Sequence, residues 1–407
     1  MITLNCSDDV KVISCGLQLL VQQSDGPARL LDVPRPATPA KQEQQEAGAR
    51  RVTCVAVSPC RKLVVAGDEY KQVCVWRLGE QITLELQQSL PRRPSCVAFT
   101  GLDGAAVLVA DKSGDVFSVE KDREPRLLLG HLSQLLALQL DPAGRFLITA
   151  DRDEKIRVSR YPNSYNIHGY CLGHTEFVTC LALSAATPTL LLSGAGDGRV
   201  ATWCYTSCTL LTSRQVAADV ECGAVRARVE PEVEGGARRV DPPAQPAVVS
   251  LKMLGCVGCG ELFVVQVEGY QGLVMYRLEG GTGAEGGADI KLVQRLPLPP
   301  PASCLLDFDT NNGELQLLVQ TEDKSVLLQT YTLNDANLLS FAGSVGMSNP
   351  QVGDFFQPIA NFESDGLANL HKRWFDNVKD YLERKEARIN KLQALQTIPE
   401  KKQKLET

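Results

Sequence analysis

The sequence predicts an all-β protein, a β-propeller of seven four-stranded sheets, followed by a C-terminal α-helical extension. Three observations lead there. Short alternating apolar runs such as LVVAG, KQVCVW, RFLITAD and TLLLSG are separated by Gly, Asp and Ser turns. No long segment with helical periodicity appears before residue 367. The strand pattern itself recurs at 40 to 45 residues, which is typical of propeller blades.

The repeat is measured between marker positions that end matching strand runs. In chain order these are Asp32, Trp76, Val119, Ser159, Trp203, Tyr276 and Gln329, at intervals of 44, 43, 40, 44, 73 and 53 residues. The longest interval contains residues 204–247, which are rich in Gly, Pro and charge, so an insertion is expected there. The predicted organisation is therefore a propeller over 1–345, a linker over 346–366, a helix over 367–396 and a polar tail over 397–407.

Composition excludes several classes of protein. The 407 residues carry a net charge of −6, so no overall basic field favours nucleic-acid binding. No run of 18 apolar residues exists, and the first twenty residues alternate without a basic start, so neither a membrane span nor a secretory signal is expected. The fourteen cysteines are scattered over strand-like positions, which favours reduced thiols of an intracellular protein.

Two cysteine pairs were weighed as zinc ligands. Cys256 and Cys259 form a C-x-x-C motif, and Cys204 and Cys208 lie four residues apart. A structural zinc site takes four soft ligands, usually from two such pairs. Neither pair has a histidine near it in sequence and both adjoin strand-like runs, so we predict thiols at strand ends and no metal.

Two units open with Gly-His and resemble the WD-repeat family. That family has a structural tetrad in which a turn Asp binds the His, which is linked through a Ser or Thr hydroxyl to a Trp indole. The matching residues are His174, Ser193, Asp197 and Trp203 in one unit, and His131, Thr149 and Asp153 in the preceding unit, where Ser159 replaces the Trp. Such a buried polar chain is stable only when every donor and acceptor is paired.

The same His and Asp pairs were considered as catalytic groups, because general-base chemistry also uses His with Asp. The pairing recurs once per repeat, however, and no nucleophile elbow, G-x-G-x-x-G, P-loop or H-E-x-x-H motif accompanies it. We therefore predict that the chain is not an enzyme and binds no cofactor of its own.

The charged stretch TADRDEKIRVS, residues 149–159, falls on the turn between the second and third strands of a blade. Spacing gives Arg152, Glu154, Lys155 and Arg157 no internal role. Two interpretations remain open: a solvated rim with weak ion pairs, or a contact surface for another protein.

Four stretches, 108–118, 148–159, 171–179 and 375–389, resemble the family of non-catalytic WD-repeat subunits of tRNA guanine-N7 methyltransferases. The resemblance implies a nuclear scaffold, possible also in the cytoplasm, that forms a heterodimer with a catalytic subunit. That subunit binds S-adenosylmethionine and methylates guanosine 46 of tRNA. The resemblance also implies that Lys112, Glu154 and Arg157 lie at the contact. Arg157 stands three residues after Glu154, a spacing that lets its side chain brace the Glu154 carboxylate. tRNA is then bound mainly through the complex.

Two other functions compete with this hypothesis. A propeller adaptor of another class, such as a substrate receptor of a ubiquitin ligase or a chromatin scaffold, needs the same fold and differs only in its rim residues. An enzyme built at the mouth of the propeller channel is disfavoured, because no spaced carboxylates or His clusters occur beyond the tetrads.

The C-terminal segment is locally basic, with ten Lys and Arg against six Asp and Glu between residues 371 and 407. Its apolar positions Trp374, Phe375 and Val378 fit a helix that packs on the propeller. Alternatively, its basic face contacts tRNA phosphates or the partner. The candidates for that contact are Lys379, Arg384, Lys385, Arg388 and Lys391.

Overall fold

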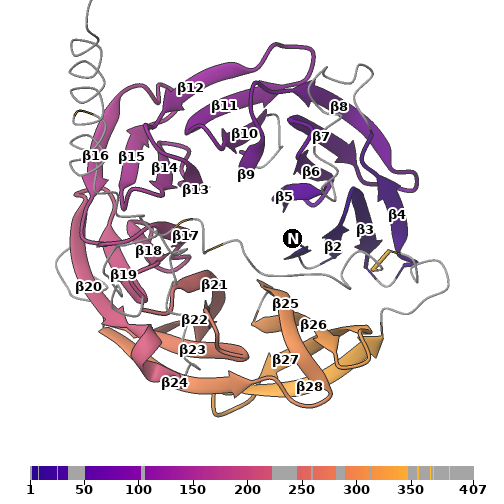
Figure 1. Ribbon diagram of the computed structural model, residues 1–407, viewed down its shortest axis with the longest axis vertical. Helices are drawn as coiled ribbons and strands as arrows, with labels where there is room; N and C mark the ends of the chain where they lie inside the picture. Colours follow the sequence, from indigo (N-terminus) through magenta and orange to yellow (C-terminus); the bar gives the residue numbers. More distant parts are fainter. Residues whose placement is uncertain are drawn as a thin grey trace, which may run out of the picture.

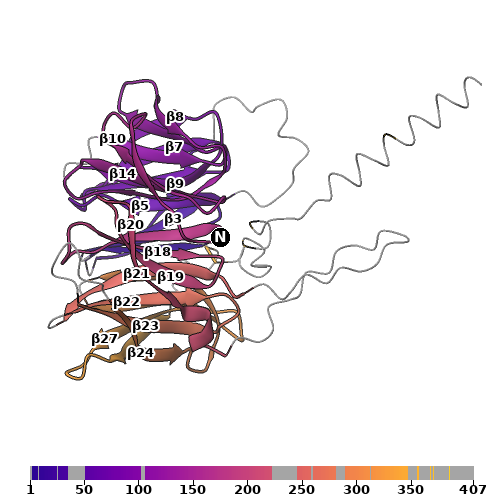
Figure 2. The ribbon, with the colours of Figure 1, turned by 90° about the vertical axis from the view of Figure 1, so that its left-hand side faces the viewer.

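The computed structural model has seven four-stranded antiparallel sheets arranged in chain order around a central axis (Figure 1). It describes residues 2–7, 9–24, 26–34, 51–101, 106–221, 245–257, 260–280, 289–311 and 313–346, together with Phe355, Phe356, Leu367, Leu370 and Lys385. Figure 2 shows the ring from the side, with neighbouring sheets packed on one another in a disc. The predicted seven-bladed propeller is confirmed.

The first four blades are built as follows. Blade 1 contains β1 (Thr3–Ser7), β2 (Val10–Cys15), β3 (Gln18–Gln23) and β4 (Arg29–Asp32). Blade 2 contains β5 (Val52–Val57), β6 (Leu63–Asp68), β7 (Gln72–Arg77) and β8 (Thr83–Ser89). Blade 3 contains β9 (Pro94–Thr100), β10 (Ala106–Asp111), β11 (Asp115–Glu120) and β12 (Arg126–Gly130). Blade 4 contains β13 (Leu135–Leu140), β14 (Phe146–Asp151), β15 (Ile156–Arg160) and β16 (Ile167–Cys171).

The remaining three blades complete the ring. Blade 5 contains β17 (Val178–Leu183), β18 (Leu190–Ala195), β19 (Arg199–Cys204) and β20 (Thr209–Gln215), followed by the 3-10 helix η1 (Val216–Asp219). Blade 6 contains β21 (Val248–Val257), β22 (Gly260–Val267), β23 (Gly272–Glu279) and β24 (Asp289–Pro297). Blade 7 contains β25 (Ala302–Asn311), β26 (Glu314–Thr321), β27 (Val326–Leu333) and β28 (Leu339–Gly346).

The core lies between blades rather than within one of them. The second strands β6, β10, β14 and β18 are buried along their whole length, because both of their faces pack on neighbouring sheets. One apolar cluster, for example, joins Ile148 and Val158 of blade 4 to Leu191 and Trp203 of blade 5. The outermost strands are half exposed, as β8 and β20 show.

Blades 7 and 1 meet without sharing a strand, since every sheet is built from one contiguous stretch of chain. Two carboxylates of β25 join them instead. The Asp307 Oδ2 accepts the Leu4 amide at 2.7 Å, and the Asp309 Oδ2 accepts the Cys6 amide at 2.7 Å. Phe355, beyond the last strand, is buried in the apolar cluster at this junction.

Two predicted boundaries need correction. The repeat spacing predicts Asp32 on a third strand, but Asp32 lies on β4, the outermost strand of blade 1, because the third strand is the preceding run QLLVQQ. The insertion was expected from residue 204, yet residues 209–215 form β20 and η1 follows. Any extra segment therefore begins after Asp219, and residues 222–244 lie outside the described residues.

Most of the predicted linker, C-terminal helix and polar tail also lie outside the described residues. Lys385, the one described residue between 371 and 407, is helical and exposed, and the helix over 367–396 stays a prediction. Within the described part of the chain, no helix has the length and apolarity needed to span a membrane.

Candidate functional site

The charged turn between β14 and β15 is organised by Asp151, the last residue of β14. Its Oδ1 accepts the amides of Asp153 at 2.9 Å and Lys155 at 3.0 Å, and the Asp151 amide donates to the Lys155 carbonyl at 3.1 Å. These bonds close the turn on itself and fix its backbone. The side chains of Asp153, Glu154 and Lys155 are consequently directed to the rim of blade 4.

Asp151 is also the tetrad acid of blade 4, so the assignment of Asp153 to this role was wrong. The Nδ1 of His131 lies 3.0 Å from Asp151 Oδ2, and its Nε2 lies 2.8 Å from the Thr149 hydroxyl. In blade 5 the position equivalent to Asp151 is Ala195, and the acid stands two residues later. Alignment on that later acid pointed to Asp153, although the strand end already carries a carboxylate.

Blade 5 has the complete predicted tetrad. The Trp203 indole donates to the Ser193 hydroxyl at 2.8 Å, Ser193 lies 2.8 Å from His174 Nε2, and His174 Nδ1 lies 2.9 Å from Asp197 Oδ2. Burial acts to raise the pKa of the Asp197 carboxyl, but the bonds from His174 and two backbone amides outweigh it and hold this pKa below its usual range. The pKa of Asp151 is lowered in the same way.

The expectation that Arg157 braces Glu154 is wrong. The Arg157 guanidinium is buried and hydrogen-bonded to other residues. Its Nε donates to the Ser159 hydroxyl at 2.9 Å, its Nη1 to the Gly130 carbonyl at 3.0 Å, and its Nη2 to the Ser164 carbonyl at 3.1 Å. Arg157 is 7% exposed, which also removes it from the predicted contact surface.

The guanidinium takes the place that the indole has in the next blade. Ser159 pairs with Leu147 just as Trp203 pairs with Leu191, so Ser159 holds the tryptophan position. The Trp203 ring ends beside Gly173, where an added Cβ would lie 3.1 Å from it. Arg157 likewise reaches Gly130, the glycine of the preceding Gly-His pair. The absence of a Trp in blade 4 is thus compensated by a buried arginine.

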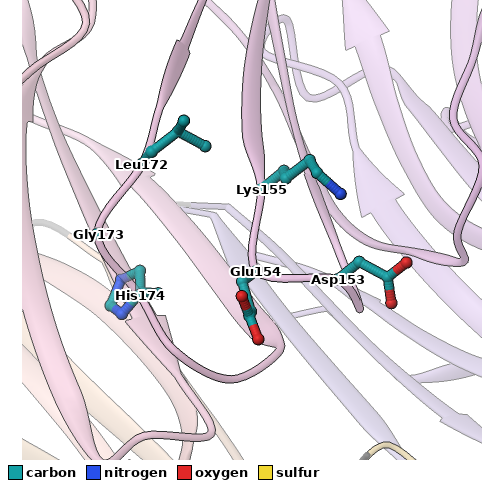
Figure 3. A pocket seen from close by; sticks show the side chains of 6 residues that line it. All are labelled: Asp153, Glu154, Lys155, Leu172, Gly173 and His174. Atoms are coloured by element: carbon teal, nitrogen blue, oxygen red, sulfur yellow. The ribbon is translucent and has the colours of Figure 1, made fainter.

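A hollow of about 480 Å³ lies between the charged turn and the chain that enters blade 5. One wall is formed by Asp153, Glu154 and Lys155, and the other by Leu172, Gly173 and His174. Figure 3 shows the Glu154 carboxylate on the side of the turn that faces the His174 segment. Leu172 is exposed, so the hollow combines charge with apolar surface.

At the matching position of the neighbouring turns, a glycine lies close against other parts of the chain. Gly114 in blade 3 and Gly198 in blade 5 have left-handed φ angles of +102° and +72°. A Cβ on Gly114 would meet the backbone oxygens of Ser133 and His131 within 2.7 Å, and one on Gly198 would meet the Pro246 oxygen at 2.8 Å. Both turns are covered by the next stretch of backbone.

At the matching position of blade 4, Glu154 is left-handed with a φ of +71°. Only glycine adopts this conformation without a conformational cost, so the Glu154 side chain is present at the expense of backbone strain. Lys71 in blade 2 and Lys324 in blade 7 share the conformation. What distinguishes Glu154 is that its side chain borders the hollow.

The other predicted contact residues divide into two groups. Lys112 and Lys155 are exposed on adjacent blades, as a contact surface requires. Arg152 is engaged within the chain, because its Nε donates to the Leu370 carbonyl at 3.1 Å. This bond places part of the segment that follows blade 7 at the rim of blade 4. Of the five basic candidates in that segment, Lys385 alone is described, and the other four lie outside the described residues.

Sequence reasoning missed Leu172 and the strained backbone of Glu154. The strained backbone of Glu154 could have been predicted from the sequence, because the turns ADKSGD and GAGDGR have Gly at the position where ADRDEK has Glu. Leu172 gave no comparable signal, since its exposure depends on how blade 5 packs.

Comparison with known proteins identifies the family. The family described as "tRNA methyltransferase TRM82 WD40 domain" matches residues 21–124 and 120–298. A zebrafish (Danio rerio) protein named "tRNA (guanine-N(7)-)-methyltransferase non-catalytic subunit wdr4" is 32% identical over 362 residues, covering 86% of this chain and 80% of the relative.

The chain belongs to the TRM82 WD40 family.

A second family member, from Culex quinquefasciatus and named "tRNA (guanine-N(7)-)-methyltransferase non-catalytic subunit wuho", is 30% identical over 354 residues, or 85% of this chain and 78% of its own length. Among solved structures, a chain of "Crystal Structure of Mitotic Checkpoint Complex" superposes with a TM-score of 0.58 at 13% identity, covering 80% of this chain and 87% of that one. At this identity the likeness concerns the fold alone. The sequence relationship confirms the predicted family resemblance, and the fold confirms the predicted seven-bladed propeller.

Proposed function

We propose that this chain is the non-catalytic subunit of a tRNA (guanine-N7) methyltransferase, and that it holds the catalytic subunit at the rim of blade 4. The partner binds S-adenosylmethionine and methylates guanosine 46, and the two chains form a nuclear heterodimer. Membership of the TRM82 family and the names of its members support this proposal. The structural observation that carries it is the strained Glu154 beside the hollow.

The rim has the properties of a preformed docking site. Asp151 fixes the backbone of the turn, so little conformational entropy is lost when a partner binds. Glu154 supplies a negative charge and Leu172 an apolar wall. A lysine or arginine of the partner fits such a hollow, because its aliphatic stem packs on Leu172 while its charged end meets the carboxylate.

Glu154→Gly is the sharpest test, because it removes the carboxylate and relieves the backbone at once. We expect the variant to fold normally, to bind the catalytic subunit at least about tenfold more weakly, and to support less tRNA methylation. Lys71→Gly is the matched control, since it relieves the same left-handed conformation on blade 2. Binding measured by titration calorimetry should be unchanged in the control. Equal affinities for wild type and Glu154→Gly would refute the site.

The competing adaptor function is separated by an unbiased purification of the tagged chain from cells. Recovery of the methyltransferase in equal amounts supports the proposal. Recovery of ubiquitin-ligase components without a methyltransferase would replace it.

Contact between the C-terminal basic residues and tRNA remains a separate prediction. Neutralising Lys379, Arg384, Lys385, Arg388 and Lys391 should weaken tRNA binding by the complex and flatten its salt dependence. Affinity and salt slope equal to those of the wild-type complex would contradict the contact.

A further inference from the structure

Three cysteines of blades 4 and 5 meet where the two blades touch. Cys171 ends β16, Cys204 ends β19, and Cys208 lies in the turn before β20. All three are free thiols. Cys171 is 1% exposed, and Cys208 packs against the apolar cluster that contains it. Each of the Cys171 and Cys208 thiols lies close enough to the other to influence its pKa.

The backbone on both sides makes room for this contact. A Cβ on Gly169 of β16 would lie 2.5 Å from the Cys208 sulfur, so only glycine allows the sulfur to rest on the strand there. Gly169 and Cys171 are two residues apart and therefore face the same side of β16. Cys208 itself has a left-handed φ of +57°, and its thiol donates to the Tyr205 carbonyl at 3.5 Å. The turn is shaped so that the Cys208 sulfur is held over β16, on the face that also carries Cys171.

A metal site is the alternative use of clustered thiols. Among the described residues, no group of three or more His, Cys, Asp or Glu side chains is arranged to hold a metal ion. His168, the imidazole on the same strand, has its Nε2 2.7 Å from the Thr206 carbonyl. The geometry therefore favours chemistry between two sulfurs.

We propose that Cys171 and Cys208 form a reversible disulfide that joins the outermost strand of blade 4 to the β19–β20 turn of blade 5. Hydrogen peroxide serves as the oxidant. The more exposed Cys208 sulfur, as thiolate, attacks one peroxide oxygen, so that the O–O bond breaks and a sulfenic acid and hydroxide form. The Cys171 sulfur then attacks the sulfenic sulfur, the S–S bond forms, and the S–O bond breaks. Two thiols and one peroxide give one disulfide and two waters.

The environment keeps the pair reduced until an oxidant is present. Burial raises the pKa of Cys171 and of Cys208, so only a small fraction of Cys208 is the attacking thiolate at neutral pH, and oxidation quickens as the pH rises. The disulfide would also act on the rim, because Cys171 directly precedes Leu172, Gly173 and His174, which form one wall of the hollow. Oxidation fixes that wall to blade 5.

The test is peptide mapping of the reduced full-length chain after brief exposure to peroxide and alkylation of the remaining thiols. Trypsin places Cys171 in the peptide 161–199 and Cys208 in the peptide 200–214. We expect these two peptides to be linked through Cys171 and Cys208, and dithiothreitol to release them. A link through Cys180 or Cys204, or no link at all, would overturn the proposal.

Three variants assign the sulfurs. Cys208→Ser should abolish the link, and Gly169→Ala should lower its yield severalfold while every thiol is retained. Cys60→Ser is the matched control, since Cys60 is also half buried but lies in blade 2, and it should leave the yield unchanged. Full yield in the Gly169→Ala protein, with its fold verified by circular dichroism, would contradict the geometry.

Discussion

Blades 4 and 5 are neighbours that fill the same buried position with different chemistry. In blade 5 the position holds the Trp203 indole, which donates to Ser193 and completes the tetrad. In blade 4 it holds the Arg157 guanidinium, which donates to Ser159 and to two carbonyls. Both groups are flat, both donate hydrogen bonds, and both reach the glycine before the histidine. The position therefore demands volume and donors, and an aromatic ring is one way to supply them.

The same two blades differ at their rims. The blade 5 turn is covered by backbone and needs Gly198, whereas the blade 4 turn borders a hollow and carries Glu154. A repeated framework thus allows one turn to differ from its neighbours without altering the strands beneath it.

The largest expected effect belongs to Trp203→Ala. The side chain is fully buried between the blades and its loss leaves a large cavity. The free energy of unfolding should therefore fall by about 3–5 kcal/mol. Urea denaturation measures this difference. A loss under about 1 kcal/mol would mean that the tetrad contributes little to blade 5.

Arg157→Ala comes next, with an expected loss of about 2–3 kcal/mol, because the carbonyl of Gly130 and the buried carbonyl of Ser164 lose their charged donor. The double variant Arg157→Ala, Ser159→Trp rebuilds the arrangement of blade 5 and should recover part of that loss. Denaturation midpoints of the single and double variants compare them. If the double variant is no more stable than the single one, a tryptophan cannot replace the Arg157 guanidinium in blade 4.

The tetrad acids should behave alike in both blades. Because the folded pKa of Asp151 and Asp197 is lowered, each carboxylate stabilises the fold above the unfolded pKa near 3.9, and this stability is lost as the pH falls towards the folded value. Asp151→Asn or Asp197→Asn should cost about 1–2 kcal/mol at pH 7. Thermal unfolding from pH 7 to pH 3 should show the difference from wild type shrinking below about pH 4. A constant difference would exclude the carboxylate as its cause.

The smallest effect is expected at the turn. Glu154→Gly should raise stability by about 0.5–1 kcal/mol, because glycine accepts the left-handed conformation. Lys71→Gly should give a similar gain. Differential scanning calorimetry of both variants checks this, and a clear loss of stability in Glu154→Gly alone would show that its side chain has a structural role.

The fold was largely predictable, because strand alternation and the spacing of turns are local properties of the sequence. The blade 5 tetrad was predictable for the same reason, since its four residues stand at fixed spacing. The blade 4 acid was misassigned because Asp153, 22 residues after His131, fits the 23-residue spacing of His174 and Asp197 better than Asp151, which stands 20 residues after it. Only the turn geometry shows that Asp151 is the partner.

The role of Arg157 was out of reach of sequence reasoning. Its three partners come from β15 itself, from the preceding blade and from the following loop, so the pairing depends on packing. The engagement of Arg152 by Leu370 has the same origin, since 218 residues separate the two.

The junction between β1 and β25 has a wider consequence. At this junction, two carboxylates of blade 7 accept hydrogen bonds from backbone amides of blade 1. The junction is therefore a contact between two complete blades, like every other boundary between blades in the ring. A circularly permuted gene, opened between two other blades, would still encode seven intact sheets. Duplication or deletion of one unit would likewise leave all the remaining strand ladders whole, which gives such a protein a simple route to change its size.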